Sequence, residues 1–597
     1  MKTPLTLMPI AIAVASTVIM LGCMTAENET VTHKDQDSVH GSIAGQQIVE
    51  IEAVAKKIHE SDNLTRPLVK PHVTAIPSAL PEQVTQAQVR REALSKQKAR
   101  TREVMRFSSP LTAALSQLRH PAEPLDRENY QHFDDNPVKR AAEQPVSTFS
   151  IDVDTGAYAN VRRFLNQGRL PREDAVRIEE LVNYFSYDYP QPEGKHPFSV
   201  NTELSATPWN KDTLLLHVGV QGKDIAKQAL PPSNLVFLVD VSGSMQSPNK
   251  LELLKNSMKL LTKQLRAQDR VSMVVYAGAS GIVLPPTTGD QTATIHQALD
   301  KLTAGGRTNG AAGIKLAYQM AQQGFVKNGI NRVILSTDGD FNVGTTDFEA
   351  LIDLIEEKRK GGVSLTTLGF GMGNYNDHLM EQIADAGNGN YAYIDTLNEA
   401  QKVLVDEMSS TLNTIAKDVK IQIEFNPAQV AEYRLIGYEN RMLKREDFNN
   451  DKIDAGEIGA GHSVTALYEL SLVGGKGNYT DPLRYGSRSL LEKSAKNHEL
   501  AFLRLRYKQP GGDTSTLLEQ AINQQHIQAE LTGSSNRFRF AASVAAFGQQ
   551  LRGADYLKDY GYDDILALAR QSRGNDPFGY RGKFVKLVNL AKSLSSR

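Results

Sequence analysis

The segment that most constrains the fold is residues 235–245, which read Leu-Val-Phe-Leu-Val-Asp-Val-Ser-Gly-Ser-Met. Five apolar residues followed by Asp240 are typical of a parallel strand that is buried on both faces. The strand leads into a short loop that carries Ser242 and Ser244. Carboxylate and hydroxyl oxygens are suitable ligands for a hard divalent cation such as Mg²⁺. Asp and Ser are also ordinary turn and helix-cap residues, so this loop alone does not define a metal site.

Two further segments place oxygen-bearing side chains after predicted strands or in tight loops. Residues 305–310 form a glycine-rich loop that contains Thr308, and residues 332–337 form a second apolar strand that is followed by Asp338. In open α/β sheets, ligands bind outside the carboxyl ends of the strands, where all these residues would lie. Position by position, the set resembles the metal-ion-dependent adhesion site (MIDAS) of von Willebrand factor type A (VWA) domains. Its five members are Asp240, Ser242, Ser244, Thr308 and Asp338.

This resemblance implies a role for each side chain. The hydroxyls of Ser242, Ser244 and Thr308 would bind Mg²⁺ directly, and Asp240 and Asp338 would bind it directly or through water. Mn²⁺ and Ca²⁺ are alternatives. One coordination position would remain open for an Asp or Glu carboxylate of a protein partner. The expected function is therefore adhesion or scaffolding, without enzyme activity.

Two other functions stay open at this point. An acidic residue of the chain's own flanking domains would occupy the metal if the site served intramolecular assembly, and a chaperone-like role for an envelope complex is a further alternative. Metal-assisted hydrolysis is a minor alternative, because it needs a base or an activated water. None of the 13 histidines lies in the three metal loops.

Strands and helices alternate regularly between residues 231 and 416. Predicted strands lie at 235–240, 271–276, 332–337, 363–370 and 390–394, and predicted helices lie at 250–266, from 292, from 309, at 348–360, from 377 and at 398–417. This alternation implies right-handed crossovers and a doubly wound parallel sheet covered on both faces. The last helix is expected to lead directly into a strand at Val419.

Strand patterns flank this α/β unit on both sides. Predicted strands at 147–155, 198–205 and 213–220 precede it, and strands at 419–425, 432–438, 463–472 and 499–507 follow it. We therefore expect one β-sandwich into which the VWA unit is inserted. Helices are predicted at 158–167 and 177–185, and a C-terminal helix carries Phe540, Val544, Phe547 and Leu551 at core spacing. Trp209, the only tryptophan, is expected to be a packing anchor. The run at 150–158 resembles the N-terminal domain of a family of bacterial type A lipoproteins.

The N-terminus has the layout of a bacterial secretory signal. Lys2 is followed by an uncharged, mostly apolar run that ends at Gly22 and Cys23, the only cysteine of the chain. Residues 20–23, Met-Leu-Gly-Cys, resemble a lipobox, although the family's usual leucine position holds Met20. Acylation of Cys23 would anchor the chain in a membrane, and the non-acidic Met24 implies the outer membrane, facing the periplasm. An uncleaved membrane anchor is the alternative.

Composition sets the remaining boundaries. Residues 24–130 are polar, poor in aromatics and punctuated by prolines, so we expect a disordered or helical tether. The expected domains are thus 1–23, 24–130, 131–230, 231–416 and 417–597. The whole chain has 67 basic and 68 acidic residues, which gives no reason to expect a nucleic-acid partner.

Two further acidic motifs have competing interpretations. Asp152-Val-Asp154-Thr155 resembles the nucleophile motif of haloacid-dehalogenase-type phosphotransferases, but it is one residue too short, and an exposed turn is the simpler interpretation. Residues 447–457 resemble the opening of a calcium loop, but Lys452 and Ile458 stand where an EF-hand needs glycine and glutamate. A charged hairpin tip is the alternative for that segment.

Overall fold

The computed structural model describes residues 127–339, 345–481 and 498–596, which belong to one compact unit. Acylation of Cys23, the signal segment and nearly all of the predicted tether lie outside the described residues. Among the helices in the described ranges, none is both long enough and apolar enough to cross a bilayer.

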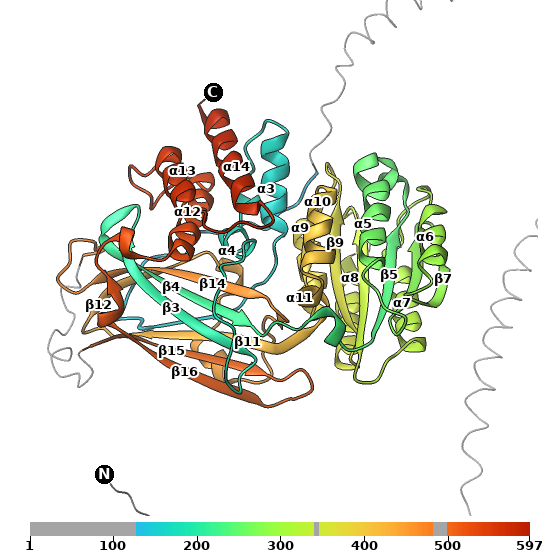
Figure 1. Cartoon of the computed structure of the whole chain (residues 1–597), viewed down its shortest axis with the longest axis horizontal. Helices are drawn as coiled ribbons and strands as arrows, with labels where there is room; N and C mark the ends of the chain where they lie inside the picture. The colour runs from blue at the N-terminus through green and yellow to red at the C-terminus, as the bar shows by residue number, and fades with distance from the viewer. Residues whose placement is uncertain (1–126, 340–344, 482–497, 597) are drawn as a thin grey trace, which may run out of the picture. The chain divides into compact units, whose positions relative to one another are not determined.

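A six-stranded sheet forms the centre of the α/β unit (Figure 1). Its strand order is β10-β9-β8-β5-β6-β7. The bounds are β5 Ser233–Asp240, β6 Arg270–Tyr276, β7 Ser280–Thr288, β8 Ile330–Thr337, β9 Ser364–Phe370 and β10 Tyr391–Ile394. All neighbours are parallel except β6 and β7, which are antiparallel. The antiparallel edge strand β7 was not among the predicted strands. Pro285 and Pro286 hid β7 in the sequence, since proline is tolerated only on edge strands.

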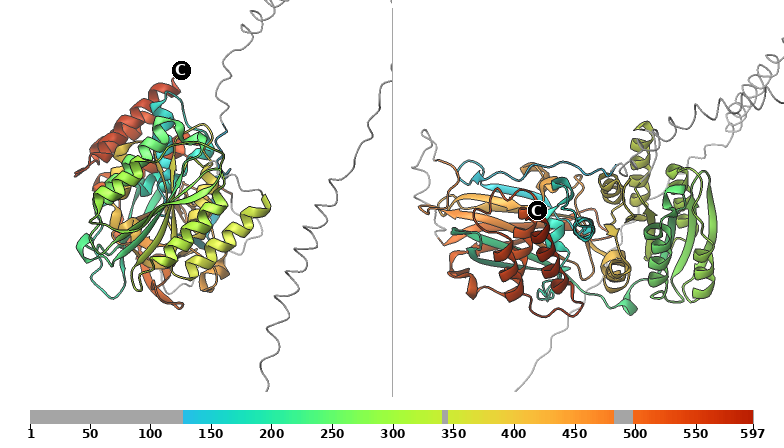
Figure 2. Two further views of the ribbon diagram at one scale, coloured as in Figure 1. Left: turned by 90° about the vertical axis from the view of Figure 1, so that its right-hand side faces the viewer. Right: turned by 90° about the horizontal axis from the view of Figure 1, so that it is seen from above.

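Helices cover both faces of this sheet (Figure 2). One face packs against α5 (Leu253–Thr262) and α6 (Thr292–Asp300), and the other against α7 (Gly310–Gln323), α8 (Thr345–Lys360) and α9 (Asp377–Ala386). Alternate residues of β5 enter opposite cores: Phe237 lies in one, and Val236 and Leu238 lie in the other. This two-sided burial explains the continuous apolar run of β5 and confirms the doubly wound fold.

The last helix of the α/β unit differs from the prediction. It consists of α10 (Leu397–Gln401), a π-helical turn (Lys402–Asp406) and α11 (Met408–Leu412). Strand β11 (Thr414–Phe425) begins two residues after Leu412, so the predicted helix over 398–417 was wrong at its end. Pairing of Thr414 and Ala416 with β13 (Ile458–Gly459) extends the strand toward the helix, a long-range effect that local propensity does not reveal.

The strands that flank the α/β unit form one sandwich. The first sheet has the order β1-β12-β14-β4-β3-β17, and the second joins β13, β11, β15 and β16, with β2 also paired to β11. The bounds are β1 Lys139–Arg140, β2 Val146–Ser150, β3 Phe198–Thr207, β4 Asn210–Gly222, β12 Val430–Ile436, β14 Ser463–Leu472, β15 Glu499–Lys508, β16 Ser515–Asn523 and β17 Ile527–Gln528. Leu216 of β4 shares one core with Ile421 of β11 and Leu503 of β15. The predicted pairing of strands from both sides of the α/β unit is thereby confirmed.

A helical layer covers the outer face of the β4–β14 sheet (Figure 1). It combines α3 (Gly156–Asn166) and α4 (Ile178–Asn183) with α12 (Asn536–Leu551), α13 (Tyr562–Gln571) and α14 (Tyr580–Ser595). Phe540, Val544 and Phe547 are fully buried in this layer, as their spacing predicted. Trp209 is also buried, and its Nε1 donates to Glu469 Oε2 at 3.1 Å, which confirms it as a packing anchor.

Candidate metal centre

Backbone hydrogen bonds bring the predicted metal loops together at the carboxyl edge of the α/β sheet. Gly305 N donates to Val241 O at 2.7 Å, and Gly243 N donates to Gly306 O at 3.0 Å. These bonds hold the loop of Thr308 against the loop of Ser242 and Ser244. Gly306 has a φ of +88°, a left-handed conformation that side chains other than glycine rarely adopt.

Asp240 is buried where β5 ends. Its Oδ1 accepts from Ser242 N at 2.8 Å, and its Oδ2 accepts from Thr337 Oγ1 at 2.8 Å. Burial raises the pKa of Asp240 to about 6, opposed by the hydrogen bonds from Ser242 and reinforced by the charge of Asp338. Two carboxylates thus lie close enough in a buried place to repel each other, which a bound cation would relieve.

The hydroxyls complete an oxygen-rich set. Ser242 Oγ and Ser244 Oγ are 2.9 Å apart, and Thr308 is half-buried on the adjoining loop. Hydroxyl and carboxylate oxygens are the ligands that Mg²⁺ and Mn²⁺ prefer. The residues present therefore fit a hard divalent cation.

Lys250 is a residue of this region that the sequence did not identify. Its Nζ donates to Asp338 Oδ2 at 2.8 Å and to Asn374 Oδ1 at 2.9 Å. Asn374 Nδ2 also donates to Asp338 Oδ2, at 3.2 Å. A lysine at the start of an amphipathic helix normally indicates a solvated face. Here the side chain is buried against Gly371, where a Cβ atom would collide with it.

Residues 127–130, which we call the N-terminal strap, hold the loop that carries Asn374. Arg127 N donates to Gly373 O at 2.9 Å, and Gly373 N donates to Glu128 Oε1 at 2.8 Å. Arg163 Nη2 lies 2.7 Å from Glu128 Oε2, and although burial raises the pKa of Glu128, Arg163 holds it below the usual value. Glu128 and Tyr130 are buried, so the prediction that the tether reaches residue 130 was wrong at its end. The strap is mostly polar and has no hydrophobic periodicity that would have revealed it.

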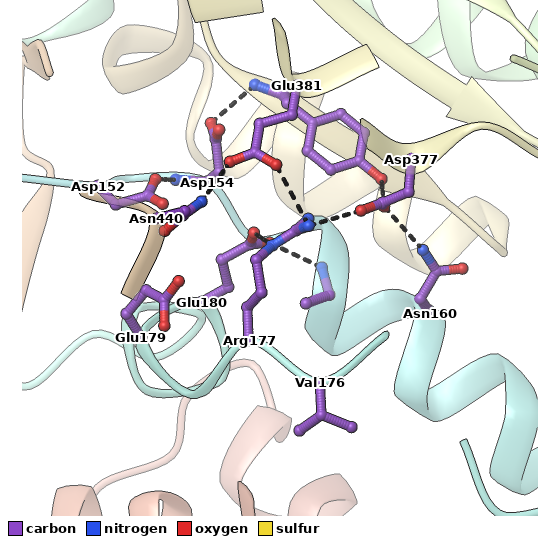
Figure 3. Close-up of polar contacts among 12 residues, drawn as sticks. Asp152, Asp154, Asn160, Val176, Arg177, Glu179, Glu180, Asp377, Glu381 and Asn440 are labelled. Atoms are coloured by element: carbon purple, nitrogen blue, oxygen red, sulfur yellow. Dashed lines mark hydrogen bonds and ion pairs between the residues drawn. The ribbon is translucent and has the colours of Figure 1, made fainter. Parts of the chain in front are cut away.

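The Asp152-Val-Asp154 motif is not the expected exposed turn, because both carboxylates are buried. Asp152 Oδ1 accepts from Asp154 N at 2.8 Å (Figure 3). Arg441 Nε lies 3.1 Å from Asp152 Oδ2, and Asp154 Oδ1 accepts from Tyr391 N at 2.8 Å. Burial and the charge of Asp152 raise the pKa of Asp154 well above its usual value. Both aspartates are engaged by Arg441 or by backbone amides, which argues against either as a phosphotransferase nucleophile.

The acidic side chains at 447–457 diverge toward different partners. Asp447 Oδ2 accepts from Lys444 N at 3.0 Å, Asp451 pairs with Arg506 at 3.1 Å, and Asp454 pairs with Arg359 at 2.6 Å. Because these carboxylates do not converge on one point, the structure favours a charged loop over a calcium loop here.

Fold and sequence together define a bacterial protein built around a VWA domain. The family model of the von Willebrand factor type A domain matches residues 234–407, a von Willebrand factor model matches residues 124–217, and the YfbK C-terminal model matches residues 410–594. The chain is 51% identical over 490 residues to YfbK of Escherichia coli (strain K12), covering 81% of this chain and 84% of that protein. The chain therefore belongs to the YfbK family.

More distant similarities concern smaller parts of the chain. Protein sll0103 of Synechocystis is 30% identical over 185 residues, which cover 31% of this chain and 43% of that protein. Among solved structures, a von Willebrand factor type A protein from Catenulispora acidiphila is 17% identical, with a TM-score of 0.37, over 64% of this chain and 89% of that chain.

Proposed function

We propose that this protein binds a divalent cation, Mg²⁺ before Mn²⁺ or Ca²⁺, and uses it to hold a carboxylate of a protein partner. The observation that carries the proposal is the meeting of two buried carboxylates, Asp240 and Asp338, at one sheet edge beside the paired hydroxyls of Ser242 and Ser244. VWA domains are in general interaction modules, often with a metal at this position. A bound cation would supply Lewis acidity toward an incoming carboxylate oxygen.

The protein's own residues would keep the site selective. Ser242 N and Thr337 Oγ1 orient the Asp240 carboxylate, and Lys250 with Asn374 orients that of Asp338. Hydroxyl ligands add no formal charge, so the cation would retain attraction for an acidic partner.

The N-terminal strap favours a second function, metal-linked assembly within the chain. Glu128 binds the backbone of Gly373, and the next residue, Asn374, binds Asp338 of the metal site. Metal occupancy would then stabilise the attachment of the flanking domain. A chaperone-like role for an envelope complex would use the same surface.

We further propose that acylated Cys23 anchors the chain in the outer membrane, facing the periplasm. Only the lipobox-like sequence supports this placement. Metabolic labelling with a palmitate analogue should mark the wild-type chain and leave Cys23→Ser unlabelled. Label that persists in Cys23→Ser would contradict the assignment.

Capture from envelope extract on the full-length chain tests partner binding. We expect a captured protein in Mg²⁺ that is released by chelator and absent with Asp240→Ala. Asp290→Ala is the matched control. Asp290 is exposed in the turn after β7, and this turn lies at the amino ends of the parallel strands, whereas the candidate metal centre lies at their carboxyl ends. Lost capture with unchanged thermal stability supports partner binding. Lost stability supports internal assembly. Capture that is unchanged by chelator and by Asp240→Ala would contradict the proposal.

A further inference from the structure

A buried cluster of carboxylates, none of which belongs to the five predicted metal ligands, joins α9 of the VWA unit to the flanking domains (Figure 3). Its six carboxylates belong to Asp152, Asp154, Glu179, Glu180, Asp377 and Glu381, each at most 4% exposed. Two guanidinium groups, those of Arg177 and Arg441, form ion pairs with these acids. The acids therefore outnumber the cations in a place where unpaired charge is costly.

Three of these carboxylates converge. One oxygen from each of Asp152, Glu180 and Glu381 lies within 4.8 Å of the other two. Oxygen ligands of a calcium ion lie about 2.4 Å from it, so two of them can be at most about 4.8 Å apart. The three residues come from the loop after β2, from α4 and from α9. The convergence is therefore a product of tertiary structure and not of one acidic segment.

Three buried oxygens in and beside this cluster accept no hydrogen bond. Glu381 Oε2 accepts no hydrogen bond, and its described ion-pair contact is Arg177 Nη1 at 3.2 Å. Glu179 Oε1 and Asn440 Oδ1 also accept none, while the other atoms of these side chains bind Tyr438 N and Glu381 Oε1. An amide oxygen and an ionised carboxylate oxygen are acceptors only, so in that state a donor or a cation is needed to satisfy them. Orphaned buried acceptors beside converging carboxylates indicate a missing positive ligand.

We propose that Asp152, Glu180 and Glu381 bind a calcium ion that links the flanking domains to α9. Calcium accepts six to eight oxygen ligands in irregular geometry, including carboxylate and amide oxygens. Magnesium needs near-octahedral geometry and retains waters, which an enclosed protein cluster accommodates less well. Asn440, whose Nδ2 donates to Glu381 Oε1 at 2.7 Å, is placed to contribute its free oxygen.

Calcium binding to the full-length Asp240→Ala variant tests this proposal without interference from the MIDAS-like site. Equilibrium dialysis with radioactive calcium should find one bound ion per chain. Glu381→Gln in the same background should weaken binding by about tenfold or more, since it removes a charged ligand. Glu349→Gln, an exposed acid on α8, is the matched control and should bind as the parent does. Absence of calcium binding in the Asp240→Ala parent would overturn the proposal, and so would equal affinity of the Glu381→Gln variant.

Thermal unfolding gives a second measurement in case Glu381→Gln folds poorly. A ligand that binds only the folded state raises the melting temperature. About 1 mM Ca²⁺ should therefore raise the melting temperature of Asp240→Ala and of its Glu349→Gln derivative. An unchanged melting temperature in both proteins would contradict the site. Both proteins carry Asp240→Ala, so an unchanged melting temperature would say nothing against the proposed metal site at Asp240. The two proposals can therefore fail independently.

Discussion

Lys250 Nζ lies 2.8 Å from Asp338 Oδ2, so a buried cation of the protein already holds one of the two carboxylates of the candidate metal centre. This ion pair has two consequences. It stabilises the metal-free site, because an unpaired buried carboxylate is costly. It also weakens the binding of a metal cation at the same site, since like charges repel at short range.

Replacing Lys250 with Met tests both consequences. Without metal, we expect Lys250→Met to lower the free energy of unfolding by about 3 kcal/mol, because Asp338 loses its buried cationic partner. The affinity for Mg²⁺ should rise by about tenfold, as a repelling charge is removed. Urea denaturation in chelator and titration calorimetry measure the two effects.

Lys259→Met is the control for that variant. Lys259 lies on α5, which directly follows the π-helical turn Pro248–Glu252 that carries Lys250, but Lys259 pairs with the exposed Asp300. Exposed pairs contribute about 1 kcal/mol or less, so stability and Mg²⁺ affinity should change little. Equal effects of the two substitutions on stability and on Mg²⁺ affinity would contradict the proposed interaction of Lys250 with the metal site.

Glu128→Gln tests the N-terminal strap. The change leaves Arg163 without its carboxylate partner in a buried place, and we expect a loss of about 3 kcal/mol of stability. Denaturation with urea measures it. Glu143→Gln, which weakens a more exposed pair with Arg140, should cost about 1 kcal/mol or less. If Glu128→Gln were as mild as the control, the strap would not hold the loop beside the metal site.

His217 predicts a pH dependence of stability. Burial, helped by the charge of Arg537, lowers the pKa of His217 to about 3, while Tyr189 Oη lies 2.8 Å from its Nε2. The unfolded state has a pKa of about 6.5, so it binds a proton first as the pH falls. The contribution of neutral His217 is thus complete above about pH 6.5 and declines toward pH 3.

The variant His217→Gln isolates this contribution. Between pH 7 and pH 5, the wild type should lose about 2 kcal/mol more stability than His217→Gln, which cannot be protonated. Urea denaturation across that range, at constant ionic strength, gives the difference. If the free energies of unfolding of the two proteins changed equally with pH, the assignment of a buried neutral histidine would be contradicted.

The features of this structure that the sequence predicts are those that depend on local sequence patterns. The apolar run into Asp240 and the second run into Asp338 identify buried strands and their oxygen-bearing ends from short segments. The alternation at 231–416 likewise gave the doubly wound architecture, because helix and strand periodicities are local signals.

Most of the unpredicted features depend on contacts between distant residues. Arg441 meets Asp152 across 289 positions, and charged residues in isolation resemble surface turns. Prolines concealed the edge strand β7, and the polar strap resembled a tether. β7 pairs with the preceding strand β6, so its omission reflects the prolines alone. The partners of Arg441 and of the strap are far away in the sequence, where composition and periodicity carry no information.

Titration calorimetry of Mg²⁺ into the full-length protein tests the central claim most directly. The account predicts a binding event in the wild type and in Asp290→Ala that disappears in Asp240→Ala, with all three proteins folded. Uptake of Mg²⁺ by Asp240→Ala that equals wild-type uptake, or no uptake by the wild type, would contradict it.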